Sequence, residues 1–329
     1  MKKILAITVA SVIAAGSITA CSAEAATNEV SDEKISIVTT IFPEYDWVMN
    51  VLGDNPAGAE VTMLLDDGVD LHSYQPTVDD IMKIADCDLF ICVGGESDEW
   101  VEDALAEATN DDMIVINLLD VLGDSVVEEE IVEGMEGEEE EAEEGEEEEG
   151  PEYDEHVWLS LRNAKVLVES IEEALVTVDP DNESTYSQNA DSYEAELTVL
   201  DEEYSAVVSQ AACDTVLFGD RFPFRYMTDD YGLNYYAAFV GCSAETEASF
   251  ETITFLANKV DELSLNAVLT IEGADHSIAE TIVENTAAQD QQILTLDSMQ
   301  SVTASDVEAG ASYISIMESN LEVLREALS

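Results

Sequence analysis

Residues 179–211 read DPDNESTYSQNADSYEAELTVLDEEYSAVVSQA, and this stretch determines how the rest of the chain is organised. Its apolar and aromatic residues recur at spacings of four and three, which places them on one face of a helix. They are Tyr186, Ala190, Tyr193, Leu197, Leu200, Tyr204, Val207 and Ala211. The opening DPDN is typical of a helix N-terminus. About 26 residues at 1.5 Å each predict a rod of roughly 40 Å, long enough to bridge two lobes.

Short apolar runs alternate with helical patterns on both sides of this predicted rod, which is typical of parallel sheets with crossover helices. On the N-terminal side we expect strands at 35–40, 61–65, 89–93 and 114–118, and helices at 45–52, 78–85 and 100–108. On the C-terminal side we expect strands at 215–218, 235–239, 267–271 and 293–296, and helices near 222–230, 247–263 and 277–288. A last helix carries an apolar stripe of Tyr313, Met317, Leu321, Leu324 and Leu328.

The sequence therefore predicts an α/β protein of two lobes, each with a mainly parallel sheet flanked by helices, joined by one long backbone helix. We expect the N-terminal lobe at 34–180, the linking helix at 181–211 and the C-terminal lobe at 212–329. The N-terminal lobe includes a stretch, 128–150, that holds 15 Glu in 23 residues and almost no apolar side chain. Like-charge repulsion predicts a disordered, solvated loop there.

The charge of the whole chain excludes one class of partner. Its 329 residues include 75 acidic and 10 basic side chains, for a formal net charge of −65. Nucleic-acid binding requires clustered Lys and Arg, so no nucleic-acid partner is expected. Hydrophobic residues nevertheless make up 46% of the chain, which is enough for folded cores and argues against global disorder. Strong self-repulsion favours a monomer.

The N-terminus has the features of an export signal. Lys2 and Lys3 precede an apolar run from Ile4 to Ala15, about 12 residues against the roughly 20 that a spanning helix needs. Small residues then precede Cys21, which resembles a bacterial lipoprotein signal; an ordinary signal peptide with an incidental cysteine is the alternative. We expect a signal peptide at 1–20, a lipidated linker at 21–33, and an extracytoplasmic protein anchored to the bacterial cell membrane by lipid on Cys21.

Four further cysteines, Cys87, Cys92, Cys213 and Cys242, show no C-x-x-C spacing. An extracytoplasmic location permits disulfides, but the spacing and the apolar neighbours favour free, buried thiols. A zinc cluster built from thiolates is not indicated.

The chain has only three histidines, His72, His156 and His276. We expect all three beyond the carboxyl ends of strands, where ligands bind in open parallel sheets. Asp220, shortly after the predicted strand 215–218, adds a carboxylate at a fourth such position. A single histidine is more often structural, but two histidines in one lobe together with carboxylates in the other favour a functional role for these residues.

The sequence around these residues resembles the cluster A-I solute-binding lipoproteins of zinc and manganese ABC transporters, also called the zinc-uptake or metal-binding adhesin-like family. The resemblance covers nearly the whole of the mature chain expected after removal of the signal peptide. The segments that match the family are Ile41-Phe42-Pro43, Val69-Asp70-Leu71-His72-Ser73-Tyr74-Gln75-Pro76, Val93-Gly94-Gly95, His156-Val157-Trp158-Leu159 and the C-terminal helix from Tyr313. The blocks around His72 and His156 are the specific ones.

The resemblance implies a metal cleft between the lobes. Two family ligands carry over to His72 and His156, and a third, His or Glu in the family, falls on Asp220. A fourth, a carboxylate, falls on Asp275 or Glu272, and His276 is an alternate. The variable loop before the second histidine is often His-rich in zinc members, whereas here it is Glu-rich.

The resemblance also implies a function in transport. The bound ion, zinc favoured and manganese possible, is cargo delivered to an ABC-transporter membrane permease, and no catalytic cofactor is implied. Two nitrogens with two carboxylates suit both metals, whereas a third histidine would favour zinc. The competing hypotheses are a lipid-anchored surface adhesin and a metal-dependent hydrolase, although neither an H-E-x-x-H motif nor a serine nucleophile elbow is present.

Overall fold

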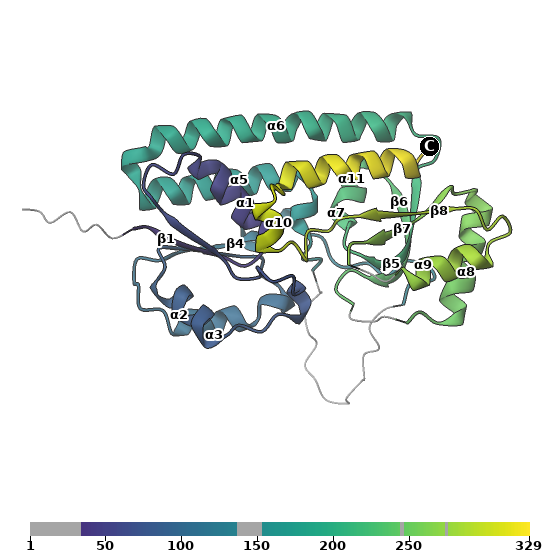
Figure 1. Ribbon diagram of the computed structural model, residues 1–329, viewed down its shortest axis with the longest axis horizontal. Coiled ribbons are helices and arrows are strands. Elements are labelled where there is room, and N and C mark those ends of the chain that lie inside the picture. Colours follow the sequence, from purple (N-terminus) through teal and green to yellow (C-terminus); the bar gives the residue numbers. More distant parts are fainter. Residues whose placement is uncertain (1–33, 137–152, 244–246, 274–275) are drawn as a thin grey trace, which may run out of the picture. The chain divides into compact units, whose positions relative to one another are not determined.

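The computed structural model describes residues 34–136, 153–243, 247–273 and 276–329, and this part of the chain contains two four-stranded sheets (Figure 1). The first has the order β2-β1-β3-β4 and the second β6-β5-β7-β8, and every pairing in both is parallel. The strands are β1 Ser36–Thr39, β2 Glu60–Met63, β3 Leu89–Cys92, β4 Ile114–Asn117, β5 Thr215–Phe222, β6 Asn234–Val240, β7 Ala267–Ile271 and β8 Gln292–Leu296. The predicted α/β architecture with parallel sheets is confirmed.

Helices occupy most of the remaining described chain. The α-helices are α1 Phe42–Leu52, α2 Val78–Asp86, α3 Trp100–Ala106, α4 Leu118–Leu122, α5 Leu161–Val178, α6 Glu183–Gln210, α7 Arg225–Tyr231, α8 Phe250–Leu263, α9 Ser277–Asn285, α10 Ala304–Glu308 and α11 Tyr313–Ala327. The 3₁₀ helices are η1 Leu71–Ser73, η2 Glu96–Asp98, η3 Gly123–Ser125, η4 Val157–Leu159 and η5 Pro180–Asn182. Helix α5 is not among the helices expected from the sequence.

The long helix α6 runs beside α5 and α11 and contacts α1 as well (Figure 1). The predicted stripe is confirmed over Tyr186, Ala190, Tyr193, Leu197, Leu200 and Tyr204, which are all buried. Val207 is half-buried, and Ala211, also half-buried, lies one residue beyond the end of α6. Its start differs from the expected cap. Pro180–Asn182 forms η5, and the Asn182 side chain donates to Asp179 at 2.7 Å and does not cap the helix.

The larger of two hydrophobic clusters includes residues of both sheets, together with α1, α5, α6 and α11. Trp47 of α1 meets the edge of Tyr313 of α11, with ring centroids 5.3 Å apart. The Tyr204 hydroxyl of α6 donates to the Met317 carbonyl of α11 at 2.7 Å. A second, smaller cluster lies around β7, α8 and α9. Because the larger core is shared, the two sheets are held by common helices and not by a flexible linker.

The Glu-rich stretch predicted as a disordered loop from 128 to 150 is described only as far as Glu136. This first part makes defined contacts: the Glu136 backbone N–H donates to the Ala238 carbonyl at 2.9 Å, and Glu130 pairs with Arg225 at 2.6 Å. The disorder expected for 128–136 was therefore wrong, because pairing and backbone hydrogen bonds offset the repulsion there. Residues 137–150 lie outside the described part of the chain.

Cys87, Cys92, Cys213 and Cys242 are free thiols, as predicted, although Cys213 and Cys242 are half-buried and not fully buried. Within the described ranges, no helix combines the length and the apolar character needed to cross a bilayer. The predicted signal peptide, Cys21 and the linker fall in residues 1–33, outside those ranges.

Candidate metal centre

Two short 3₁₀ helices position His72 and His156. His72 is the middle residue of η1, and its backbone N–H donates to Asp70 Oδ1 at 3.1 Å. His156 directly precedes η4, and its backbone N–H donates to Asp154 Oδ1 at 2.9 Å. His156 therefore does not follow a strand, and the sequence-based expectation of a strand end was wrong for it. An aspartate two residues earlier fixes the backbone of each histidine.

The two imidazole rings face each other in the interior. Their Nε2 atoms are 3.1 Å apart, His156 is 0% exposed and the His72 side chain is 9% exposed. Nitrogens about 2.0–2.1 Å from a shared zinc ion at a tetrahedral angle lie about 3.3 Å apart. The observed separation therefore suits two nitrogens that bind one ion.

Cys242 is the third member of this group. It follows β6 by two residues, and its Sγ and the ligating nitrogens of His72 and His156 all lie within 4.8 Å of one another. Sequence reasoning missed it, because it treated the cysteines only as candidates for disulfides or thiolate clusters. The usable signal was its place at the carboxyl end of a predicted strand, the rule already applied to the histidines.

Asp154 orients His156 through its side chain as well as its backbone. Asp154 Oδ1 lies 3.0 Å from Nδ1, so the ring donates its Nδ1–H to the carboxylate and keeps the Nε2 lone pair for a ligand. The Asp154 carbonyl in turn accepts the Tyr226 hydroxyl of α7 at 2.7 Å. A residue of the C-terminal side of the fold thereby helps to fix the segment that carries His156.

His72 has two oxygens near its other nitrogen. Its Nδ1 lies 2.7 Å from Ser97 Oγ and 3.6 Å from Glu155 Oε2, an oxygen that has no hydrogen-bond partner. Burial, together with the neighbouring His156 ring, lowers the pKa of His72 to about 3. The imidazole is therefore neutral at physiological pH, which is the form that binds metal. Burial also raises the pKa of Glu155.

Asp220 lies apart from this group. The expectation that it follows a strand was wrong, because β5 continues to Phe222 and Asp220 sits where the register shifts between Phe218 and Arg221. Asp220 Oδ1 accepts the Arg221 N–H at 2.9 Å, and Oδ2 accepts the Ile271 N–H at 3.2 Å. Its oxygens thus bind backbone groups of β5 and β7.

Arg221 beside it forms an ion pair with Asp70, the residue that caps η1. Burial by itself would raise the pKa of Asp70, but the charge of Arg221 outweighs burial, and the pKa lies below its usual value. The pair connects β5 to the segment that carries His72, so it joins the two sheets next to the candidate site.

The structure describes two of the three candidates for the fourth ligand, Glu272 and His276. Glu272 follows β7, and its carboxylate accepts the Ser298 N–H and hydroxyl, both at 2.6 Å, and the Gln300 N–H at 3.2 Å. His276 stands at the N-cap of α9 with φ of 59°. Neither belongs to the group of His72, His156 and Cys242. Asp275 lies outside the described residues.

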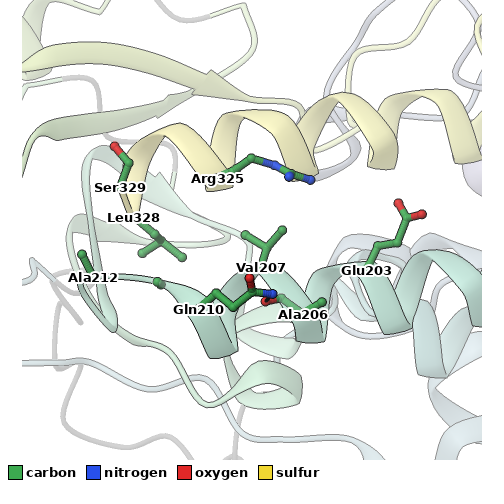
Figure 2. A pocket seen from close by; sticks show the side chains of 9 residues that line it. Glu203, Ala206, Val207, Gln210, Ala212, Arg325, Leu328 and Ser329 are labelled. Atoms are coloured by element: carbon green, nitrogen blue, oxygen red, sulfur yellow. Dashed lines mark hydrogen bonds between the residues drawn. The ribbon is translucent and has the colours of Figure 1, made fainter.

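A hollow of about 390 Å³ lies elsewhere, between the C-terminal ends of α6 and α11 (Figure 2). Figure 2 shows Ala206, Val207 and Leu328 in its lining, and Glu203 and Arg325 on opposite helices. No histidine or cysteine lines it. It offers a metal ion no ligand set comparable to that around His72.

Residues 37–327 match the family described as zinc-uptake complex component A, periplasmic (ZnuA). The chain belongs to this family. Among curated relatives it is 32% identical over 296 residues to the zinc-binding lipoprotein AdcA of Streptococcus pneumoniae serotype 4, an alignment that covers 90% of this chain and 56% of the relative. It is 29% identical over 296 residues to the high-affinity zinc uptake system protein ZnuA of Bacillus subtilis, covering 90% and 88%.

The chain spans about half the length of the AdcA proteins that it matches, at 56%. Among solved structures, the Zn(II)-bound ZnuA-like domain of S. pneumoniae AdcA aligns with TM-score 0.69 and 29% identity, covering 90% of this chain and 99% of that domain. The metal-dependent lipoprotein YcdH of B. subtilis aligns with TM-score 0.72 and 25% identity, covering 90% and 100%. The laminin-binding protein Lmb of Streptococcus agalactiae, at 22% identity and TM-score 0.71, covering 90% and 100%, shares the fold.

Proposed function

We propose that this chain is an extracytoplasmic solute-binding protein that captures a divalent transition metal and delivers it to the membrane permease of an ABC transporter. Zinc is the favoured cargo and manganese the alternative. The observation that carries the proposal is the buried His72–His156 pair, whose Nε2 atoms are 3.1 Å apart. Membership of the ZnuA family, and relatives named for zinc binding and zinc uptake, support it.

Capture follows from the chemistry of the pair. The ion exchanges bound water for two imidazole nitrogens, and both rings are held by hydrogen bonds before it arrives. Asp275 remains the proposed fourth ligand from the family resemblance, with Glu272 and His276 as alternates. Asp220 as third ligand would have to bind metal while it accepts two backbone N–H groups, or lose them.

The proposal includes the layout of the chain. Residues 1–20 would be removed as a signal peptide, Cys21 would carry lipid, and 21–33 would link it to the body. The lobes at 34–180 and 212–329, joined by 181–211, would then sit outside the cell membrane as a monomer. A net charge of −65 supports the monomer, because copies repel each other.

Two other functions compete with this one. A metal-dependent hydrolase needs an open coordination position and space for substrate, whereas His72 and His156 are buried. An adhesin role has one supporting observation, the fold shared with Lmb, a laminin-binding protein. Fold alone does not specify function, so transport is preferred.

Titration of the metal-free protein with zinc and with manganese, read by calorimetry and by analysis of bound metal, tests the proposal. The wild type should bind one zinc ion per chain, and His72→Ala and His156→Ala should each weaken binding severely. Asp306→Asn, which changes a carboxylate of α10 that is not in the proposed ligand set, serves as the control and should keep tight binding. Tight stoichiometric zinc in the His72→Ala/His156→Ala double variant would overturn the proposed site.

A further inference from the structure

We propose that Cys242 is a protein ligand of the captured metal, so that the site presents two imidazole nitrogens and one thiolate. This inference rests on the proposed function, because a thiolate ligand would determine which metal ion the proposed site selects. A thiolate ligand favours zinc and disfavours manganese, which prefers oxygen ligands.

The backbone after β6 is built to bring Cys242 to the histidines. Gly241 lies against His156, and a Cβ on Gly241 would approach His156 Cε1 to 2.8 Å and the Phe222 carbonyl oxygen to 3.0 Å. A larger residue would therefore push the strand end away from the ring. Glycine at 241 allows the chain to pass the imidazole closely, and the next side chain is Cys242.

The distances between Cys242 Sγ and the histidine nitrogens would suit metal coordination if these atoms moved slightly closer together. With metal–nitrogen and metal–sulfur bonds of about 2.0–2.1 Å and 2.3 Å, a tetrahedral zinc ion sets nitrogen and sulfur about 3.6 Å apart. The three atoms already lie within 4.8 Å of one another. Movements of about 1 Å, within the reach of side-chain torsions, complete the geometry.

The surrounding charges favour a bound dication. The carboxylates of Glu155, Asp154, Glu129 and Glu96 lie near the Cys242 thiol. When the ion binds, the Sγ–H bond breaks, the proton leaves to solvent and an Sγ–metal bond forms. The positive ion then compensates both the new thiolate and the neighbouring carboxylates.

The other thiols differ from Cys242 in their surroundings. Cys92 is buried in β3, where its thiol donates to the Ile116 carbonyl at 3.7 Å. Cys213 is half-buried like Cys242, but its thiol donates to the Thr215 carbonyl at 3.5 Å. Neither belongs to a group of possible ligands in the described chain. Cys213 is therefore the matched control for a test of Cys242.

Cobalt(II) spectroscopy of the metal-free protein provides the first test. The wild-type cobalt complex should show the near-ultraviolet sulfur-to-cobalt charge-transfer band. Cys242→Ser and Cys242→Ala should lose this band, whereas Cys213→Ser should keep it. A wild-type complex without the band overturns the inference, and this arm needs no variant to fold.

Zinc and manganese titrations of the same proteins provide the second test. Loss of the thiolate should weaken zinc binding by at least about tenfold and change manganese binding less, so the zinc-to-manganese affinity ratio should fall in Cys242→Ser but not in Cys213→Ser. An unchanged ratio in a Cys242→Ser protein with native circular dichroism overturns the inference. In that case, continued stoichiometric zinc binding that depends on His72 leaves the proposed function intact, and absence of zinc binding in the wild type overturns both.

Discussion

At the scale of single residues, the site depends on which nitrogen of each histidine carries a proton. Asp154 holds the proton of His156 on Nδ1, so His156 Nε2 accepts from His72 Nε2–H in the metal-free protein. Metal binding at His72 Nε2 requires that proton to move to Nδ1. Ser97 Oγ and the unpartnered Glu155 Oε2 lie 2.7 Å and 3.6 Å from His72 Nδ1, so either oxygen can accept a hydrogen bond from the Nδ1–H group. Glu155 Oε2 would therefore gain a hydrogen-bond partner when the ion binds, whereas Oε1 already accepts the Ser97 N–H at 2.9 Å in the metal-free protein.

Replacing Asp154 by Asn tests this orientation. Asp154→Asn keeps an oxygen that can accept the backbone N–H of His156, but it removes the charge that fixes the ring proton on Nδ1. Zinc affinity should fall by about 10- to 100-fold, as is typical for the loss of a carboxylate that supports a histidine ligand. Competition with a zinc chelator measures the change.

Asp306→Asn is the matched control. Asp306 also accepts a backbone hydrogen bond, from Thr303 at the N-cap of α10. The Asp306→Asn variant should therefore bind zinc as tightly as the wild type does. If Asp154→Asn binds zinc as tightly as the wild type does, the ring of His156 is oriented by packing alone.

At the scale of elements, apolar periodicity predicted most of the fold. The stripe from Tyr186 to Tyr204 specified α6, and alternating runs specified all eight strands of the described chain to within a few residues. Helix α5 was readable too, since Leu161, Ala164, Leu167, Val168 and Ile171 follow helical spacing and are buried.

The site was predicted only in part. His72 and His156 stand out because histidine is scarce and because their sequence blocks are specific. Cys242 belongs to the group only because β6 pairs with β5 and ends beside His156, a tertiary relation that sequence spacing does not contain. Asp220 was misplaced for a similar reason, since the irregularity in β5 that turns its carboxylate towards backbone N–H groups has no sequence signal of its own.

Helix α6 should stabilise the protein through its buried face alone. Leu197 is 0% exposed in the shared core, and Leu197→Ala removes buried methyl groups and leaves a cavity. We expect the free energy of unfolding of the metal-free protein to fall by about 2–5 kcal/mol. Val199→Ala, two residues along the same helix at a side chain 57% exposed, should change it by less than about 0.5 kcal/mol. Equal losses in urea unfolding would contradict the predicted orientation of the helix.

At the scale of the whole molecule, the candidate site joins segments that are far apart in sequence, and the shared core holds them together. His72 and His156 belong to segments beside the first sheet, whereas Cys242 and Arg221 belong to the second. The Arg221–Asp70 ion pair and the Tyr226–Asp154 hydrogen bond connect these parts at the site itself. Small shifts between the sheets would therefore change the distances among His72, His156 and Cys242.

The same fold must hold together a chain with a net charge of −65. Repulsion among its carboxylates opposes the compact state, and salt screens that repulsion over a Debye length of about 10 Å at 0.1 M. The thermal midpoint of the metal-free protein should therefore rise as sodium chloride increases from about 0.05 to about 0.3 M, by about 2 °C for each kcal/mol gained. Potassium chloride should act equally, because screening depends on ionic strength and not on the cation. A midpoint that stays constant or falls in both salts would show that the ion pairs, such as Arg225–Glu130, outweigh the repulsion.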